Sequence, residues 1–375
     1  MVRRGMGNWL GGKGAVTRVV PTILLLMLVM LSAACSFSGR AERPTGSPTT
    51  TLTPSGDVLR IDGEIVRRVL IPDPAQDPRY ALTDRWLYVR GNNVWTPTRT
   101  ESDERELLID PTNIERIFRG AHPMCGLTND DASADEPSQL EVSLDGGTSW
   151  RPLGQGENVE PIAFDPVNPD VLYGSDCNLA ISTTSGNTWM HIDPLPDYAL
   201  TELEIIDDRL LLLGTTLVGG SQLIEVDIAD PQEPVIGEIL LNVPGTASFD
   251  ASEGRIVVGT ADTVHLSTDG GLTWATSKVG LESVTAPIAS PAAERPDGAT
   301  VVDDVGILTV KIGVSAGRLY AGTPHGLYLS QDDGTTWVRY DEVSPNARVT
   351  KIQYGLGGAD LYVTTDDGVV VIPAP

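Results

Sequence analysis

The carboxylates most suggestive of chemistry are Asp110 and Asp165, each followed by proline at the next position and by asparagine three positions on. Two carboxylates held across a groove can hydrolyse a glycosidic bond, and their separation sets the stereochemical outcome. The same pattern is also typical of a tight turn after a strand, and its recurrence favours this structural interpretation. The sequence, with four histidines, shows no Ser-His-Asp pattern, histidine cluster or phosphate-binding glycine loop.

Four repeated segments predict the elements that position such side chains. They share the pattern Ser-x-Asp/Thr-x-Gly-x-Thr/Ser-Trp, with Thr184 in place of aspartate in the second copy. Aspartate accepts hydrogen bonds from a turn, glycine supplies positive φ, and tryptophan opens the returning strand, so each segment predicts a β-hairpin. The repeated residues are Ser143, Asp145, Gly147, Trp150; Ser182, Gly186, Trp189; Ser267, Asp269, Gly271, Trp274; and Ser330, Asp332, Gly334, Trp337.

The pattern resembles the Asp-box, or BNR, repeat of sialidases, sortilin-type receptors, xyloglucanase-like glycosidases and photosystem II assembly factors. The resemblance covers most of residues 57–375. It implies a β-propeller in which each box joins the third and fourth strands of a blade, away from the active face. The boxes therefore indicate the fold and not a chemical activity.

The spacing of the tryptophans predicts the number of blades. Trp95 keeps the frame of an eroded box, and the interval from Trp189 to Trp274 is long enough for two repeats, which places a blade without a box near 198–240. The last unit, 350–375, ends after three strands. A strand at 57–66 would pair with it and close the ring. We expect an all-β, seven-bladed propeller over 57–375, with six blades as the alternative.

In this architecture the turns between the second and third strands share one face with the links between blades, and ligands usually bind there. An insertion at 281–304, rich in proline and alanine, would overhang this face. The acidic set indicates a basic partner or a calcium site, although turns are rich in aspartate for structural reasons alone. The predicted face comprises Asp84, Arg85, Asp130, Asp131, Asp176, Asp262, His325 and Asp366.

Catalysis of the sialidase type is disfavoured by the motifs. The resemblance implies an early aromatic-Arg-Ile-Pro motif, but Phe118-Arg119 is not followed by Ile-Pro. An acidic protein is also a poor host for an anionic sugar. We expect a non-catalytic binding scaffold for a protein or a glycan, with a sialidase-like or xyloglucanase-like glycoside hydrolase as the alternative.

The N-terminus predicts export and a lipid anchor. Residues 1–18 carry four basic side chains, and the apolar run after them spans about 13 residues, shorter than the roughly 20 that a membrane-spanning helix needs. Small residues before Cys35 resemble a bacterial lipobox, so we expect a signal peptide over 1–34, lipidation of Cys35, and a disordered tether to residue 56 rich in Ser, Thr, Pro and Gly. An ordinary signal peptidase site is the alternative.

Export also bears on the two remaining cysteines, Cys125 and Cys177. In an oxidising compartment a disulfide between them can persist, and the alternative is two separate buried thiols.

The net charge of −25 limits the partners. Loss of the four basic residues with the signal peptide would take it to about −29. Such a field repels nucleic acid and anionic headgroups, so we expect no nucleic-acid partner and membrane attachment through the lipid alone. We expect a monomer with no cofactor, calcium being the one candidate ion.

Overall fold

The computed structural model describes residues 56–72, 76–102, 105–120, 139–154, 158–195, 198–206, 208–216, 219–252, 254–261, 263–281, 284 and 306–375. All of them belong to one compact unit, 48–375. The expected signal peptide, Cys35 and the tether up to residue 55 lie outside the described residues, as do Cys125, Asp130, Asp131, Asp262 and most of the insertion at 281–304.

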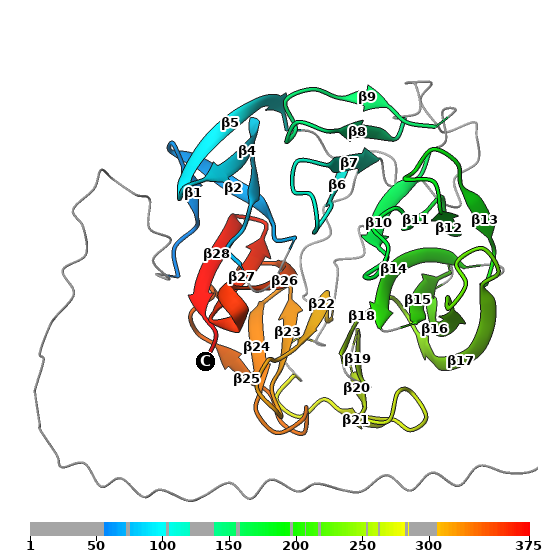
Figure 1. The fold of residues 1–375 in the computed structure, drawn as a ribbon. Helices are drawn as coiled ribbons and strands as arrows, with labels where there is room; N and C mark the ends of the chain where they lie inside the picture. The colour runs from blue at the N-terminus through cyan, green and yellow to red at the C-terminus, as the bar shows by residue number, and fades with distance from the viewer. Residues whose placement is uncertain are drawn as a thin grey trace, which may run out of the picture. The chain divides into compact units, whose positions relative to one another are not determined.

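Seven antiparallel sheets follow one another around a common axis, as Figure 1 shows. Within each sheet the strands pair in chain order, which makes every sheet one blade. The described part of this unit is a seven-bladed β-propeller, as the tryptophan spacing predicts. Its helical element among these residues is one 3-10 turn at Leu356–Gly358, and none of them forms a helix long and apolar enough to cross a membrane.

The first four blades run as follows. Blade 1 holds β1 (Arg60–Ile61), β2 (Glu64–Leu70), β3 (Tyr80–Thr83), β4 (Trp86–Gly91) and β5 (Val94–Glu101). Blade 2 holds β6 (Glu106–Ile109), β7 (Ile117–Gly120), β8 (Glu141–Ser143) and β9 (Arg151–Pro152). Blade 3 holds β10 (Glu160–Phe164), β11 (Leu172–Ser175), β12 (Leu179–Ser182) and β13 (Met190–Ile192). Blade 4, the blade without a box, holds β14 (Ala199–Ile206), β15 (Arg209–Thr215), β16 (Gly220–Asp227) and β17 (Val235–Pro244).

The last three blades complete the ring. Blade 5 holds β18 (Ala247–Ser252), β19 (Arg255–Thr260), β20 (Val264–Ser267) and β21 (Ala275–Ser277). Blade 6 holds β22 (Thr309–Ile312), β23 (Leu319–Thr323), β24 (Gly326–Ser330) and β25 (Val338–Tyr340). Blade 7 holds β26 (Val349–Gly355), β27 (Asp360–Thr365) and β28 (Gly368–Pro373).

The ring is closed by the start of the described chain. Val58 bridges Val370 of β28, and Leu59 N–H donates to Val369 O at 2.7 Å. The predicted single strand at 57–66 is instead divided. Its first part completes blade 7, and the rest forms the β1–β2 hairpin of blade 1, turned at Asp62 and Gly63, which both have positive φ. The pairing that closes the ring is confirmed, although it involves only two residues.

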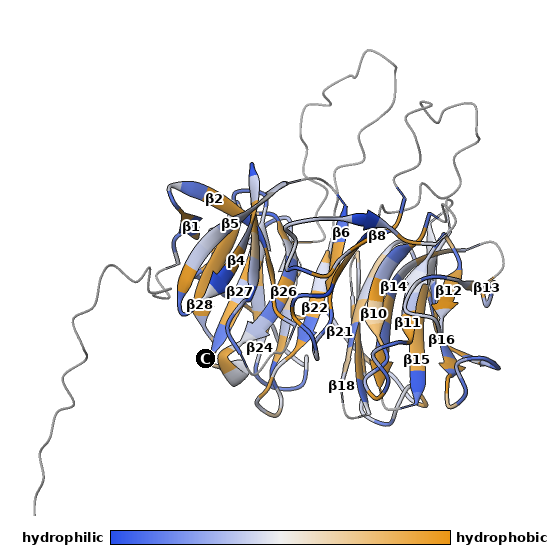
Figure 2. Cartoon of the chain, turned by 45° about the horizontal axis from the view of Figure 1, so that its top comes forward, coloured by the Kyte–Doolittle hydropathy of each residue, from blue (hydrophilic) through white to orange (hydrophobic). Residues whose placement is uncertain are grey.

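The core is distributed between blades. Seven clusters of buried apolar side chains each join two neighbouring sheets, and together they go once round the ring. Figure 2 shows hydrophobic residues concentrated on the strands and hydrophilic residues in the turns at both ends of the sheets. Because each sheet is covered on both faces, its middle strands are almost wholly apolar, as buried strands require.

The inner strands carry β-bulges at corresponding places. The register against the second strand shifts between Val66 and Arg68, Pro161 and Ala163, Leu200 and Glu202, and Val349 and Lys351. An extra residue in one strand reverses the alternation of side chains beyond it and increases the local twist. The bulges therefore decide which residues of β2, β10, β14 and β26 face the axis.

The four repeated segments form turns of one geometry between the third and fourth strands. In the first, Ser143 Oγ accepts from Gly147 N–H at 2.8 Å, and Asp145 accepts from Ser149 N–H at 2.9 Å and from Ser149 Oγ at 2.6 Å. The other two turns with aspartate repeat these bonds. Hydrogen bonds, above all from the Ser149 hydroxyl, lower the pKa of Asp145. The serine and aspartate side chains of these turns thus bond within the turn and have a structural role.

The degenerate turn keeps part of this network. Thr184 Oγ1 accepts from Thr188 N–H at 2.9 Å and lies 2.8 Å from Thr188 Oγ1. One hydroxyl thus replaces two carboxylate oxygens, and the charge is lost.

Restoring the carboxylate by Thr184→Asp is expected to stabilise the protein by about 0.5–1.5 kcal/mol at pH 7, because charge-assisted hydrogen bonds replace neutral ones. In the three intact turns the folded-state pKa of the aspartate is lowered, so the gain should be present above the unfolded pKa and lost as pH falls through the folded one. Urea unfolding at pH 7 and pH 3 measures both effects, with Thr184→Ser as the control that keeps a hydroxyl. Equal stabilities of the Asp and Ser variants at pH 7 would contradict this account.

Candidate functional site: the axial channel

The inner strands surround a channel along the axis of the ring. Its upper chamber, a cavity of about 480 Å³, lies towards the ends at which these strands begin, and is lined by β10, β14, β18, β22 and β26. Its lower chamber, about 330 Å³, lies towards the other end between β2, β6, β10 and β26. Both chambers share Ile71, Ile162, Lys351 and Gln353, so they adjoin, and we call the two together the axial channel.

Three carboxylates in the upper chamber tie neighbouring blades together. Glu202 accepts from Phe249 N–H at 2.8 Å, and Glu204, two residues along β14, accepts from Ala251 N–H at 2.7 Å. Side chains at i and i+2 of one strand thus satisfy backbone donors at i and i+2 of the next. Asp250 continues the series, since it accepts from Ile312 N–H at 2.6 Å and forms an ion pair with Lys311. Blades 4, 5 and 6 are joined in this way at the axis.

Burial and mutual charge set the ionisation of this group. Desolvation raises the pKa of Glu202 to about 7. Desolvation and the nearby Asp250 carboxylate raise the pKa of Glu204 well above its usual range. Desolvation lowers the pKa of Lys311, but Asp250 and Glu204 outweigh it and leave that pKa raised. The cluster therefore holds fewer negative charges at neutral pH than its three carboxyl groups would carry in water.

Glu202→Gln is expected to change the pH dependence of stability. Because the folded-state pKa of Glu202 lies above the unfolded one, its stabilising contribution is full below the unfolded pKa of about 4.5 and is lost as pH rises through about 7. Glutamine does not ionise, so the free energy of unfolding of the variant minus that of the wild type should rise by roughly 2–3 kcal/mol between pH 5 and pH 8. Urea unfolding at several pH values measures this difference, and a difference independent of pH would contradict the assignment.

Ion pairs also link strands of blades 1 and 2. Arg68 of β2 pairs with Glu106 of β6. Arg105 and Arg119 both contact Glu141 Oε2 at 2.7 Å. In these ion pairs, as in the hydrogen-bonded carboxylates of the upper chamber, charged side chains link strands and have their partners within the protein.

The predicted face residues that the structure describes lie in the turns between second and third strands, next to the beginnings of the inner strands. We call this side the upper face. Asp84 accepts from Arg67 Nε at 2.6 Å, and the same guanidinium donates to Asp366 O at 3.0 Å, which links blades 1 and 7. Arg85 lies over the ring of Trp86. The structure thus places the predicted residues on one face, but it does not bring them together in one cluster.

The other turns on this face are also locally bonded. Asp176 contacts His191 Nδ1 at 2.7 Å and accepts from Asn178 N–H, while Asp366 accepts from Arg348 N–H at 3.0 Å. The N–H of His325 donates to Thr323 Oγ1, an ordinary turn contact. Among the described residues, no three His, Cys, Asp or Glu side chains come together in a way that could hold a metal ion.

Cys177, in the same turn as Asp176, is disulfide-bonded. Because Cys125 lies outside the described residues, its pairing with Cys177 remains a prediction.

Asp110 and Asp165 occupy turns after the innermost strands and are not free to act on a substrate. Asp110 is 1% exposed and accepts from Thr112 N–H at 2.8 Å and Arg116 Nε at 2.7 Å. Asp165 accepts from Asn168 N–H at 2.8 Å and Tyr173 OH at 3.2 Å. These bonds agree with the interpretation of both residues as turn formers.

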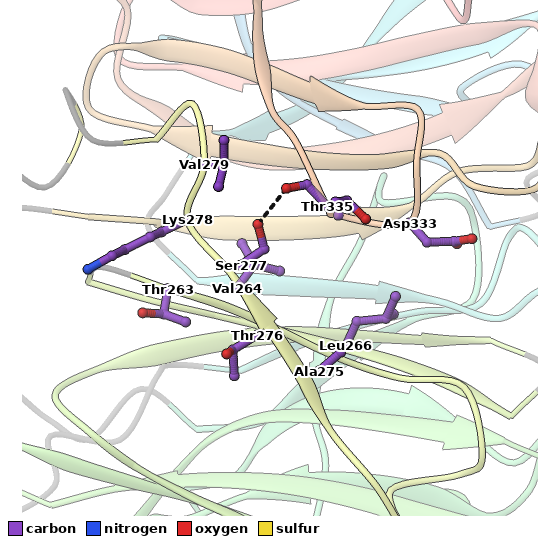
Figure 3. A pocket seen from close by; sticks show the side chains of 11 residues that line it. Thr263, Val264, Leu266, Ala275, Thr276, Ser277, Lys278, Val279, Asp333 and Thr335 are labelled. Atoms are coloured by element: carbon purple, nitrogen blue, oxygen red, sulfur yellow. Dashed lines mark hydrogen bonds between the residues drawn. The ribbon is translucent and has the colours of Figure 1, made fainter.

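A second hollow lies outside the axis, between blades 5 and 6. Figure 3 shows Lys278 at one end of this groove and Asp333 at the other, with Ser277 Oγ donating to Thr335 O at 2.8 Å. Asp333 is already paired with Arg255 at 2.5 Å. The groove, about 590 Å³, is lined by hydroxyl and aliphatic groups without an aromatic ring, and its carboxylate is engaged, so the axial channel is the better candidate site.

No family model and no curated protein matches the chain. Solved structures do match. YCF48 bound to D1 peptide aligns with a TM-score of 0.53 at 13% identity, covering 85% of this chain and 96% of that one. A GH74 enzyme of Niastella koreensis aligns with a TM-score of 0.50 at 16% identity, covering 79% of this chain and 50% of that one. The likeness is one of fold. The propeller spans about half the length of the GH74 enzyme.

The axial residues Glu202, Glu204, Asp250, Lys311 and Lys351 were not among the residues predicted from sequence. The signal that could have found some of them is the alternation in 201–206, where two glutamates alternate with Leu203 and Ile205. Charges at period two lie on one face of the strand, and for Glu202 and Glu204 this face is the one that reaches the backbone of blade 5.

Proposed function

We propose that the propeller is a non-catalytic scaffold for a protein partner that docks on its upper face. This proposal rests on one observation: the axial carboxylates already have partners within the ring. Glu106 is paired with Arg68, and Glu202, Glu204 and Asp250 each hold a backbone N–H of the next blade. An acid and a base for hydrolysis must be free to reach a substrate, whereas these groups hold the ring in shape.

The comparison with YCF48 supports a protein partner. That propeller is described as bound to a D1 peptide, and it is matched over nearly its whole length. A rigid ring whose turns present Arg85, Asp366 and Asp367 on one face offers a broad polar surface suited to such a partner. The acidic balance of the chain favours basic segments.

The N-terminal sequence extends the proposal to location. Lipidation of Cys35 and the tether up to residue 56 would hold the ring at the extracytoplasmic side of a membrane, within reach of a membrane complex under assembly. The chain length between anchor and ring gives the upper face freedom to meet its partner.

Site-specific photo-crosslinking in the intact host tests the docking face. A photoreactive residue at Arg85 or Asp367, both exposed on the upper face, is expected to capture one defined protein. The same residue at Leu272, which is 82% exposed on the opposite face, is the matched control. Capture from Leu272 alone, or equal capture from both faces, would contradict the proposal.

The glycoside hydrolase alternative has a separate test. Labelled sialosides and β-glucans are incubated with wild type and with Asp250→Asn, which keeps the shape of the side chain. We expect no turnover by either protein. Turnover by the wild type that is absent in Asp250→Asn would contradict the non-catalytic scaffold and identify the protein as a glycoside hydrolase.

A further inference from the structure

The lower chamber of the channel has an apolar wall. Leu70, Ile71, Leu107, Ile162 and Phe164 line it, together with prolines at the strand ends. Its volume of about 330 Å³ falls at the small end of the range for ligand pockets, which are mostly apolar with a few placed polar groups. A ligand that fits here has an apolar body of a few carbon atoms.

Two polar side chains enter this wall from one strand. Lys351 and Gln353 are two residues apart on β26 and line both chambers. Gln353 Oε1 is buried and accepts no hydrogen bond from any of the described residues. Since an unpaired buried acceptor costs about 1–3 kcal/mol, a donor from a ligand would be favoured at this atom.

The ammonium group of Lys351 forms no ion pair within 4.0 Å among the described residues, although it lies inside the ring. Lys351 is exposed to the space of the channel, and because the surrounding inner strands displace part of its water shell, this desolvation lowers the pKa of Lys351. Four charged groups act on it from other inner strands: Glu106 and Glu202 raise its pKa, whereas Arg68 and Lys311 lower it. Each of these four groups already has an ion-pair or hydrogen-bond partner. An anionic group of a ligand would therefore meet the ammonium group of Lys351 without an ion pair that it must displace.

We propose that the lower chamber, with Lys351 and Gln353 at its junction with the upper one, binds a ligand that has a carboxylate, a neighbouring amide N–H and an apolar side chain. The carboxylate accepts from Lys351 Nζ, the N–H donates to Gln353 Oε1, and the side chain packs on Ile71, Ile162 and Phe164. Free N-acyl derivatives of apolar amino acids have this chemistry, and so does the C-terminal residue of a peptide. This site goes beyond docking on the upper face and does not depend on it.

Other ligand classes fit less well. A cation would meet Lys351 in an apolar wall, and a sugar needs more donors and acceptors than the two groups on β26. A ligand of the proposed class gives a donor to the unpaired Gln353 Oε1 and an anionic partner to the Lys351 ammonium group.

Isothermal titration of the full-length protein with three related ligands tests the site. N-acetyl-L-leucine carries all three features, N-acetyl-L-leucinamide lacks the carboxylate, and 4-methylpentanoate lacks the N–H. We expect N-acetyl-L-leucine to bind at least tenfold more tightly than either of the others. Binding should weaken as pH rises, because only the protonated amine of Lys351 attracts the anion.

Variants assign the two contacts. Lys351→Met should weaken N-acetyl-L-leucine at least tenfold and leave the leucinamide unchanged, whereas Lys351→Arg should retain most of the affinity. Gln353→Leu should remove the advantage of N-acetyl-L-leucine over 4-methylpentanoate. Lys278→Met, which removes the same amine from the outer groove, is the control and should have no effect.

The relative affinities of a peptide and of N-acetyl-L-leucine distinguish a chain end from a free small molecule as the ligand. A tetrapeptide ending in leucine that binds tenfold more tightly than N-acetyl-L-leucine, with the same dependence on Lys351, would identify a chain end as the ligand. Equal affinities of the two would identify a free small molecule. Absence of binding by every ligand at millimolar concentration, or binding indifferent to Lys351→Met, would overturn the proposal, and neither result would bear on crosslinking at the upper face.

Discussion

Asp250→Ala is expected to lower the free energy of unfolding by about 3–5 kcal/mol, the usual cost of removing one partner from a buried ion pair. The Asp250 side chain is 4% exposed, and its loss leaves both the Lys311 ammonium and the N–H of Ile312 without their acceptor. These groups belong to blade 6, whereas Asp250 belongs to blade 5, so the loss weakens a contact between blades. Urea unfolding followed by tryptophan fluorescence measures it.

The double variant Asp250→Ala, Lys311→Met separates the ion pair from the rest. Removal of the ammonium group relieves the uncompensated charge, so the double variant should recover part of the stability that Asp250→Ala loses. The remaining loss reports the bond to Ile312 N–H. A loss below about 1 kcal/mol for Asp250→Ala would show that the axial carboxylates are not structural, and would remove the main support for a non-catalytic ring.

Trp337→Ala is the second change with a large expected effect, about 3–5 kcal/mol. Trp337 is 3% exposed and packs in the apolar cluster between blades 5 and 6. Its indole N–H donates to Gly334 O at 3.1 Å, and its backbone N–H donates to Val279 O at 2.9 Å. The substitution leaves a cavity between blades 5 and 6. The remaining backbone hydrogen bond to Val279 does not replace the packing that is lost.

Leu272→Ala provides the comparison for this prediction. Leu272 lies in the equivalent turn of blade 5 and is 82% exposed, so its replacement should change stability by less than about 0.5 kcal/mol. Both variants are compared with wild type by thermal and urea unfolding. Similar losses at both positions would mean that the turns, and not the packing of the tryptophan, dominate the junction.

The amino-acid sequence by itself determined the propeller fold and the place of the repeated turns, and it predicted seven blades with six as the alternative. Each turn is built on a network within eight residues, such as Ser143 to Trp150, in which the serine and aspartate side chains bond to near neighbours in the chain. Local hydrogen bonding of this kind leaves a pattern that recurs with the blade. The interval between Trp189 and Trp274 likewise indicated blade 4, which has no box.

The closing of the ring was predicted in kind but not in detail. Pairing of the first strand with the last blade is present, yet it involves Val58 and Leu59 only, because the Asp62-Gly63 turn sends the chain back as β2. The turn signal was visible in the sequence.

Only the tertiary structure decided what lines the axis. Glu202 and Asp250 bond to residues 47 and 62 positions away in the chain, and no local pattern specifies such partners. A β-bulge just before Lys351 also changes which side chains of β26 face the channel. The sequence shows where blades begin and end, but bulges and the packing of neighbouring blades choose the inward-facing residues, because these depend on contacts between segments far apart in the chain.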